Sequence, residues 1–259
     1  MLIELELRME KEKSKVINQE HEYLVNLGNT KINLKVLYED NHIIVVEKPV
    51  NIPSQGDKTE DLDMLTIIKE YSRVKYNKPG NVYLGLIHRL DRPVGGVMVF
   101  AKTSKAASRL SEQVREKIFK KRYLVIVDGK LEKEKGIFQD YLLKNERANI
   151  SKVVKEGTNN SKFAELDYEV LKYDKENNIS LVKVNLHTGR HHQIRVQFAS
   201  RNHAIYGDQK YGSRGQRQQI CLWAYSLTIK HPISKDEMNF ICLPEKQKTW
   251  KILSGIEIN

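Results

Sequence analysis

Short apolar runs separated by polar turn residues predict a chain made of many strands and a few helices. Apolar or alternating runs bounded by Gly, Pro, Asn or Asp are typical of β-strands. They predict strands within residues 35–49 and at Leu84–Ile87, Val97–Ala101, Tyr123–Val127, Phe163–Leu171, Ser180–Leu186 and Trp223–Ile229. Apolar residues at helical spacing predict helices over Met64–Tyr71 and Thr103–Lys117 and a short helix that begins near His191. Because strands and helices alternate irregularly, we expect an α+β fold with a mixed, mostly antiparallel sheet and flanking helices.

Two stretches do not fit this pattern. Residues 1–34 are charged and contain no element that the pattern can assign. We therefore predict an N-terminal extension of unknown role, followed by one domain over residues 35–259. The stretch Lys144–Lys162, with its Asn, Lys and Gly residues, predicts a long mobile loop.

The charge balance adds a polyanionic partner to this picture. The 259 residues include 44 Lys and Arg against 33 Asp and Glu, which gives a net charge of +11. Basic side chains release condensed counterions when they contact phosphates, so nucleic acid is the leading partner class. No apolar run approaches the length of a membrane span, and the acidic N-terminal residues do not suit a signal peptide, so we expect a cytoplasmic protein without a membrane contact. Cys221 and Cys242 fit neither a metal motif nor a disulfide scaffold and are expected to be reduced and buried.

Polar residues interrupt the apolar run at 85–103, GLIHRLDRPVGGVMVFAKT, and place the carboxylate of Asp91 between two arginines. Taken alone, an Asp before Arg-Pro is typical of a turn cap. Two further polar segments are difficult to explain by packing: Lys121-Arg122-Tyr123 and the run from His187 to Arg195, HTGRHHQIR. The three segments together indicate a site for chemistry.

These segments resemble, in order and approximate spacing, the motifs of the RluA-type pseudouridine synthases. The similarity rests on HRLD followed by a Gly and AKT, then KRYLVIVDG, TGRHHQIRVQF, IYGDQKYG and LWAYSLTIKHP. It extends from about Lys35 to Pro244 and implies that residues 35–259 form a pseudouridine synthase catalytic domain with a central active-site cleft. It also implies an enzyme that converts uridine in RNA to pseudouridine without a cofactor.

The resemblance implies that Asp91 is the catalytic aspartate, Tyr123 the active-site tyrosine and Arg195 the basic residue that pairs with the aspartate. Pseudouridine formation breaks the C1′–N1 bond, turns the uracil and joins C5 to C1′. A carboxylate can act as a nucleophile at C1′ or remove the 2′ proton, and a neighbouring guanidinium favours its ionised form. Tyr123 can stack on the flipped uracil or take the C5 proton, and the alternative is a strand tyrosine packed in the core.

Further polar residues of these segments are expected to contact the RNA. Because the bases of an RNA helix are stacked, the target nucleotide has to be exposed or flipped, and Arg89 could occupy the space that the base leaves. A surface or phosphate-binding arginine is the alternative. RNA or substrate contacts are expected for His88, Arg89, Arg92, Lys102, Arg190, His192, Gln193 and Ile194.

The segment from His187 onward raises two further possibilities. Thr188 could cap the helix that begins near His191. His187, His191 and His192 could suggest a metal site, but no acidic or cysteine partner accompanies them, so no metal is expected.

The sequence departs from the family motif HRLDxxTSG, because Val94 and Gly95 stand where Thr and Ser are usual, and Gln197 and Trp223 stand where His is common. These changes put the loop hydrogen bonds and the RNA contact in doubt, so the first alternative is an RNA-binding protein of the same fold that lacks turnover. The second is a glycoside or nucleoside hydrolase, although no second catalytic carboxylate is visible. A monomer is expected, and the sequence does not choose between ribosomal and transfer RNA.

Overall fold

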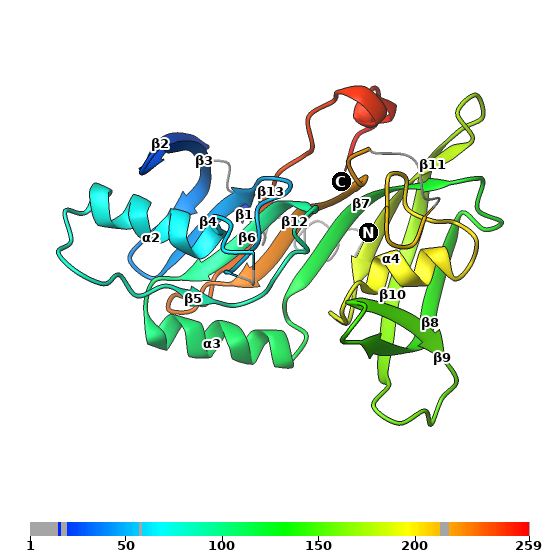
Figure 1. Ribbon diagram of the computed structural model, residues 1–259, viewed down its shortest axis with the longest axis horizontal. Coiled ribbons are helices and arrows are strands. Elements are labelled where there is room, and N and C mark those ends of the chain that lie inside the picture. The colour runs from blue at the N-terminus through cyan, green and yellow to red at the C-terminus, as the bar shows by residue number, and fades with distance from the viewer. Residues whose placement is uncertain (1–14, 17–19, 57–58, 213–217, 259) are drawn as a thin grey trace, which may run out of the picture. The chain divides into compact units, whose positions relative to one another are not determined.

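The computed structural model describes residues 15–16, 20–56, 59–212 and 218–258 (Figure 1). The chain divides into two compact units. Unit 1 consists of residues 1–120 and 226–242, and unit 2 of residues 121–225 and 243–259. The divisions fall at the start of strand β7 (Lys120–Asp128) and inside strand β12 (Leu222–Lys230), so each unit is built from segments that are distant in sequence.

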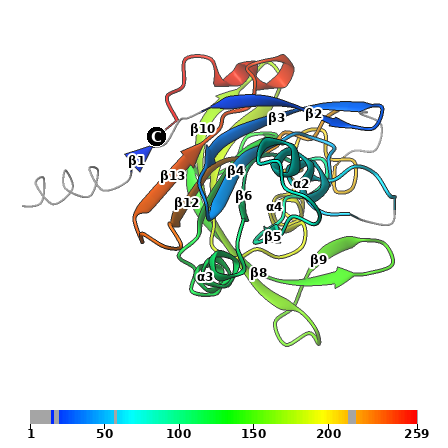
Figure 2. The same cartoon turned by 90° about the vertical axis from the view of Figure 1, so that its left-hand side faces the viewer.

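Unit 1 contains an antiparallel run of strands in the order β2-β3-β4-β6 (Figure 2). Strand β5 pairs antiparallel with β6, β13 pairs antiparallel with β12, and β1 pairs parallel with β13. Every residue of β6 is buried, which explains its continuous apolar sequence, since a strand covered on both faces does not alternate. The strands are β1 Lys15–Val16, β2 His21–Leu27, β3 Thr30–Glu39, β4 Ile43–Lys48, β5 Gly85–Leu86, β6 Gly95–Ala101 and β13 Glu237–Ile241.

Two helices with side-chain caps pack on these strands. Helix α2 (Met64–Lys75) begins after Asp63, whose carboxylate accepts hydrogen bonds from the first free backbone amides, and it packs against β2 and β3. Helix α3 (Ser104–Arg115) begins after Thr103, whose hydroxyl accepts from the Ala106 amide, and it packs against β5 and β6. Helix α3 therefore covers the two strands that flank the loop of residues 87–94, whereas α2 covers the outer strands β2 and β3.

Unit 2 is an antiparallel sheet in the order β7-β11-β10-β8-β9. Its further strands are β8 Lys135–Asn145, β9 Ile150–Val154, β10 Lys162–Asp174 and β11 Ile179–Leu186. Helix α4 (Gln193–Ala199) packs against β8 and β9, where Val196 meets Leu142 and Ala164. A 3-10 helix, η1 (Lys248–Leu253), lies near the C-terminus.

The structure confirms the α+β fold with a mixed, mostly antiparallel sheet, and each predicted strand and helix is present, although β5 is only 2 residues long. The prediction of a long loop over Lys144–Lys162 is wrong, because β9 lies inside it and pairs with β8. Residues 21–34 also form strand β2 and part of β3, where no element was predicted. Strands β1, β8 and β13 were also not predicted. Strands β2, β8, β9 and β13 consist mostly of exposed or half-buried residues, which made their sequences resemble loops. The domain boundary at residue 35 and the central cleft stay predictions.

Two smaller expectations concern the cysteines and the membrane. Cys221 and Cys242 are both buried free thiols, which confirms the prediction, and Cys242 Sγ donates to Glu47 Oε2 at 2.8 Å. Within the described ranges, no helix combines the length and the apolar character that a membrane crossing requires.

Candidate active site

The loop that carries Asp91 joins β5 to β6 in unit 1 and is anchored through its backbone. The buried Ser54 hydroxyl donates to Leu90 O at 2.8 Å and accepts from Leu90 N at 3.1 Å. On the other side of Asp91, the amide of Val94 donates to Asp91 O at 2.9 Å and closes a turn. The half-buried Asp91 side chain therefore projects from a backbone that is fixed on both sides.

A lysine lies beneath this loop, and sequence analysis did not identify it. Lys48, the last residue of β4, is 0% exposed, and its Nζ donates to Pro49 O at 2.8 Å and to Arg92 O at 3.0 Å. Burial lowers the pKa of Lys48 to about 7, the charge of Asp91 acts in the opposite direction, and that of Arg92 adds to the lowering. A lysine next to a proline at the end of an apolar run has no sequence signature that distinguishes it from a surface lysine.

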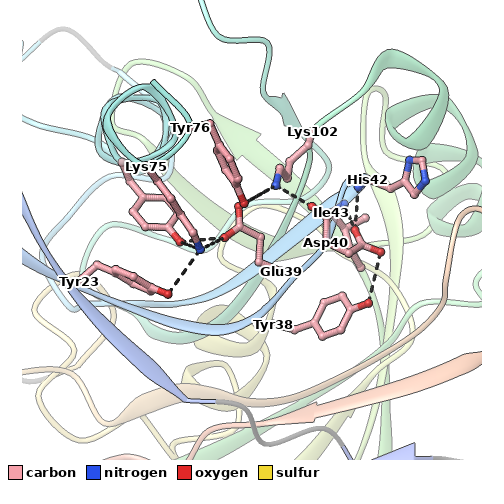
Figure 3. Close-up of polar contacts among 10 residues, drawn as sticks. Tyr23, Tyr38, Glu39, Asp40, His42, Ile43, Lys75, Tyr76 and Lys102 are labelled. Atoms are coloured by element: carbon pink, nitrogen blue, oxygen red, sulfur yellow. Dashed lines mark hydrogen bonds and ion pairs between the residues drawn. The ribbon is translucent and has the colours of Figure 1, made fainter. Parts of the chain in front are cut away.

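The predicted RNA-contacting residues of unit 1 have different surroundings. Arg89 is exposed, whereas the Nε2 atom of His88 accepts from Val99 N at 3.2 Å. Arg92 forms an ion pair with Asp61 at 2.6 Å and remains 42% exposed. Lys102 is mostly buried, and its Nζ lies 2.7 Å from Glu39 Oε1 and 2.6 Å from the carbonyl oxygen of Asp40 (Figure 3). Arg89 and Arg92 thus present charge to solvent, whereas Lys102 forms an ion pair with Glu39 and is mostly buried.

Tyr123 lies on strand β7 of unit 2, opposite Val184 of β11, and is 7% exposed. Lys121 precedes it by two residues and therefore lies on the same face of the strand. Burial lowers the pKa of Lys121, and its Nζ is 3.4 Å from the point that a β-carbon on Gly189 would occupy. A glycine at position 189 thus leaves room for this ammonium group, and sequence analysis did not assign Lys121 a role.

Arg195 in helix α4 is held by a buried carboxylate that the sequence did not single out. Its Nε and Nη2 atoms donate to the two oxygens of Asp208, both at 2.7 Å. Both residues are buried, with Arg195 4% and Asp208 2% exposed. Asp208 also accepts from the amides of Lys210 and Tyr211. Burial acts to raise the pKa of Asp208, but the hydrogen bonds and charge of Arg195 lower it further than burial raises it. The predicted pairing of Arg195 with Asp91 stays a prediction.

The start of helix α4 differs from the expected one. The residue before the helix is His192, in the left-handed region with φ 53°, and it makes no side-chain cap. The prediction that Thr188 caps this helix is wrong, because its hydroxyl donates to Gln193 Oε1 at 2.7 Å and accepts from Glu165 N. The Gln193 side chain also accepts from Arg190 N and donates to Glu165 O, so it ties the turn before the helix to β10.

The remaining predicted residues of this segment are partly used by the fold. Ile194 is buried. The exposed Arg190 donates from Nε to Phe163 O at 2.7 Å. His192 Nδ1 lies 2.9 Å from the Tyr211 hydroxyl, and its ring stacks on His191 at 3.8 Å. Of these residues, Arg190 presents the most open polar surface.

The histidines of this segment have separate polar partners. His187 Nε2 pairs with Asp167 Oδ2 at 2.6 Å, and His191 contacts Ser151 and Asn149 through its two ring nitrogens. Over the part of the chain that the structure describes, no group of three His, Cys, Asp or Glu residues is arranged to hold a metal ion.

The departures from the family motif fall mainly on buried positions. Val94 and Gly95 are buried, and the turn at Asp91 is closed by the backbone of residue 94, which Val provides as well as Thr. Gln197 is fully buried and donates to Asp140 Oδ2 at 2.7 Å. Trp223 is 8% exposed. The changes at 94, 95 and 197 therefore concern internal packing rather than an open RNA-facing surface.

Comparisons with known proteins agree with the motifs. The family model described as RNA pseudouridylate synthase matches residues 42–200. An uncharacterized RNA pseudouridine synthase of Aquifex aeolicus is 36% identical and covers 81% of this chain and 69% of its own. The dual-specificity RNA pseudouridine synthase RluA of Escherichia coli O157:H7 is 33% identical, and the match covers 80% of this chain and 91% of RluA. Ribosomal large subunit pseudouridine synthase C of Haemophilus ducreyi is 30% identical, over 81% of this chain and 65% of that protein.

Solved structures support the fold. Human RNA Pseudouridylate Synthase Domain Containing 4 matches with a TM-score of 0.69 at 22% identity, over 81% of this chain and 88% of that one. Human RNA Pseudouridylate Synthase Domain Containing 1 matches with a TM-score of 0.66. With the family model and the relatives, the chain belongs to the RluA-type RNA pseudouridine synthases, enzymes that isomerise uridine in RNA.

Proposed function

We propose that Asp91 is the carboxylate that acts on the ribose of a flipped-out uridine. The observation that supports this most directly is the anchoring of its loop by two buried groups, Ser54 and Lys48, which leave the carboxylate itself half-buried at the surface. The carboxylate attacks C1′ or removes the 2′ proton, and either route requires its ionised form. A loop fixed through its backbone holds such a group near its reacting position.

Tyr123 and Arg195 complete this proposal with the roles predicted from the sequence. Tyr123 stacks on the detached uracil or takes the proton from C5 at the last step. Arg195 is the cation that favours the ionised aspartate, and its bidentate contact with Asp208 fixes its orientation before substrate binds. Supplying a pre-oriented charge avoids reorganisation during the reaction.

The proposed RNA contacts rest on charge and exposure. Arg89 and Arg190 are exposed cations on turns next to Asp91 and helix α4, respectively, and Arg92 is partly exposed. Arg89 is proposed to fill the space that the flipped base leaves. Five further residues are proposed to support the shape of the site rather than to contact RNA through exposed charge, because their side chains already contact other parts of the protein. They are His88, Lys102, His192, Gln193 and Ile194. The substrate is ribosomal or transfer RNA in the cytoplasm, and the proposed active species is a monomer that uses no cofactor.

Replacing Asp91 with Asn tests the proposal. The change removes the reactive oxygen and little volume, so pseudouridine formation in total RNA is expected to fall by several orders of magnitude while RNA affinity and thermal stability stay unchanged. Comparing pseudouridine maps of RNA from cells with and without the gene identifies the target position. If Asp91→Asn retains activity within about tenfold of wild type, the assignment of Asp91 is wrong.

The alternative of an RNA-binding protein without turnover gives a different result in the same experiment. It predicts RNA affinity without pseudouridine in the wild type as well as in Asp91→Asn. The buried environment of Val94 and Gly95 supports turnover instead, since the departures from the motif leave the turn at Asp91 closed.

A further inference from the structure

Unit 1 contains a polar pocket that none of the proposed catalytic residues lines (Figure 3). It lies where helix α2 ends beside β2 and β3, and its volume is about 240 Å³. We call it the Tyr76 pocket. Its lining includes His21, Tyr23, Tyr38, Glu39, Lys75 and Tyr76.

The base of the Tyr76 pocket is a carboxylate shared by two ammonium groups. Glu39 accepts from Lys102 Nζ at 2.7 Å and from Lys75 Nζ at 2.9 Å, and its side chain is 7% exposed. The Tyr71 hydroxyl donates to the same carboxylate at 2.8 Å. Burial acts to lower the pKa of Lys75, but the hydrogen bond and charge of Glu39 raise it, so Lys75 is protonated at neutral pH. Two cations and one carboxylate leave a positive charge at the pocket.

The nearby Asp40 brings a second carboxylate, so the positive charge at the pocket depends on Lys78 beside Tyr76, with which three ammonium groups face two carboxylates. Its Oδ1 accepts from the amides of His42 and Ile43, and its Oδ2 contacts His231 Nε2 at 2.8 Å and the Tyr38 hydroxyl at 3.3 Å. The oxygens of Asp40 are thus engaged by the fold. Lys75 Nζ also donates to the hydroxyls of Tyr71 at 2.6 Å and Tyr23 at 3.4 Å, so its three donors are in use. Its side chain remains 35% exposed, and its charge, rather than a new hydrogen bond, acts on a ligand.

Aromatic rings surround the exposed ammonium group. The ring of Tyr76 is 41% exposed, and the Nζ atoms of Lys102, Lys78 and Lys75 lie 4.6, 5.5 and 5.6 Å from its centroid. Lys75 Nζ is also 4.9 Å from the centroid of Tyr23. An exposed ring surrounded by cations offers a face on which a base can stack and a charge that its phosphate can meet.

We propose that the Tyr76 pocket binds one nucleotide of the RNA substrate outside the modified uridine, with its base on Tyr76 and its phosphate at Lys75 and Lys78. The proposal rests on the proposed function, since it requires an RNA substrate. A pocket of about 240 Å³ is smaller than the 300–1,000 Å³ usual for small-molecule sites, which favours one unit of a longer strand over a free cofactor. The net charge of +11 attracts the rest of such a strand.

The test compares Tyr76→Ala with two variants in the full chain. Tyr76→Phe keeps the ring. It checks that position 76, the C-cap residue directly after α2, tolerates substitution. Tyr173→Ala in unit 2 removes another tyrosine that has a lysine, Lys130, over its ring at 5.8 Å. The probe is a fluorescent single-stranded oligouridylate of about 12 nucleotides, a length within the site sizes of single-strand binders. Thermal unfolding confirms that each variant is folded.

Tyr76→Ala is expected to weaken oligouridylate binding roughly 5- to 100-fold, the range for loss of one stacked base, while Tyr76→Phe and Tyr173→Ala bind as wild type. A 4-thiouridine-substituted probe is expected to cross-link to the peptide that contains Tyr76. With total RNA, Tyr76→Ala raises KM for pseudouridine formation and leaves kcat unchanged. The binding and cross-linking outcomes would also support the site if wild-type protein formed no pseudouridine, in which case only the proposed function would fail.

Two results would overturn the proposal. The first is unchanged oligouridylate affinity of Tyr76→Ala when wild-type protein makes pseudouridine, which leaves the proposed function intact. The second is loss of uridine monophosphate binding in Tyr76→Ala while oligouridylate binding persists, which assigns the pocket to a small molecule.

Discussion

The two key charges of the proposed site, Asp91 in unit 1 and Arg195 in unit 2, are held in place in opposite ways. Around Asp91 the backbone is anchored, by the hydroxyl of Ser54 and the ammonium of Lys48, and the carboxylate itself is half-buried. Around Arg195 the side chain is anchored, by two hydrogen bonds to Asp208 in a buried pair.

This difference matches what the two groups are proposed to do. A carboxylate that attacks carbon or takes a proton changes its bonding during the reaction, and the contacts of its loop backbone with Ser54 and Lys48 do not depend on that change. A guanidinium that only orients and stabilises charge keeps its bonding throughout, so a permanent partner costs nothing in the reaction. A mutation of Asp91 should therefore affect turnover more than stability, and mutations at the Arg195–Asp208 pair should affect stability first.

Asp208→Ala should give the largest change in stability. It leaves the buried Arg195 guanidinium without its carboxylate, and breaking a buried ion pair from one side costs about 3–5 kcal/mol of unfolding free energy. The double variant Arg195→Met with Asp208→Leu should be less destabilised than Asp208→Ala, because no unpaired charge remains. Urea unfolding measures both, and a double variant at least as unstable as the single one would contradict this account.

The same pair predicts a pH dependence. The pKa of Asp208 is lower in the folded chain than the ordinary value of about 3.9, so the carboxylate stabilises the fold above that pH and the contribution is lost as pH falls through the folded pKa. The stability difference between wild type and Asp208→Ala should be constant near neutral pH and shrink below about pH 4.

Lys48→Met should change how unit 1 responds to pH. The folded pKa of Lys48 is about 7 against about 10.4 in an unfolded chain, so between these values the unfolded state binds more protons and wild-type stability rises with pH. Relative to Lys48→Met, wild type should gain about 2 kcal/mol between pH 7 and pH 9. Unfolding at several pH values measures this, with Lys105→Met on the exposed face of α3 as the control. If the stability of wild type and of Lys48→Met changes with pH in the same way, burial does not lower the pKa of Lys48.

The resemblance to the RluA-type synthases predicted roles for Asp91, Tyr123 and Arg195, because each stands in a motif that is local in the sequence. It could not predict Ser54, Lys48 or Asp208, because these side chains act on residues brought near only by folding: Ser54 and Leu90 are 36 positions apart. Local motifs indicate which groups are candidates for the reaction, whereas the groups that anchor them depend on tertiary contacts.

The missed strands have a related cause. Strand β9 was taken for a loop because its residues are mostly exposed or half-buried, and β2 has the same character. Buried strands such as β6 were predicted well because their apolar sequence reflects burial on both faces. Local patterns therefore predict fully buried strands better than strands that keep exposed or half-buried residues, such as β2, β8, β9 and β13.

Ser54→Ala should separate positioning from stability. It removes a hydroxyl that makes two hydrogen bonds to the backbone of Leu90, at a cost of about 1–2 kcal/mol of unfolding free energy. The control is Ser180→Ala in unit 2, whose fully buried hydroxyl donates to Gly129 O at 2.7 Å. Both variants should lose similar stability, but only Ser54→Ala should lower kcat, with RNA affinity retained. Equal kcat in the two variants would show that the anchored backbone does not position Asp91.

Tyr123→Phe should have the smallest effect on stability, within about 1 kcal/mol, because the ring that fills the β7 face is kept and only one hydroxyl is lost.

The effect of Tyr123→Phe on turnover distinguishes the two roles of the tyrosine. If Tyr123 only stacks on the uracil, Phe should react at the wild-type single-turnover rate, while Tyr123→Ala loses about 1–3 kcal/mol of stacking. If the hydroxyl takes the C5 proton, Phe should be as inactive as Ala although it binds RNA well. We expect the second result. The strand residues that follow Tyr123 are Leu, Val and Ile, and among them a phenylalanine would be sufficient if the ring were needed only for stacking. A rearranged product still protonated at C5 should then accumulate on Tyr123→Phe. It has the same mass as uridine, so RNA tritiated at C5 detects it, as rearranged RNA that keeps its tritium, whereas completed pseudouridine releases it. Full single-turnover activity of Tyr123→Phe would assign the tyrosine to stacking and leave Asp91 as the only proposed group that moves a proton or attacks carbon.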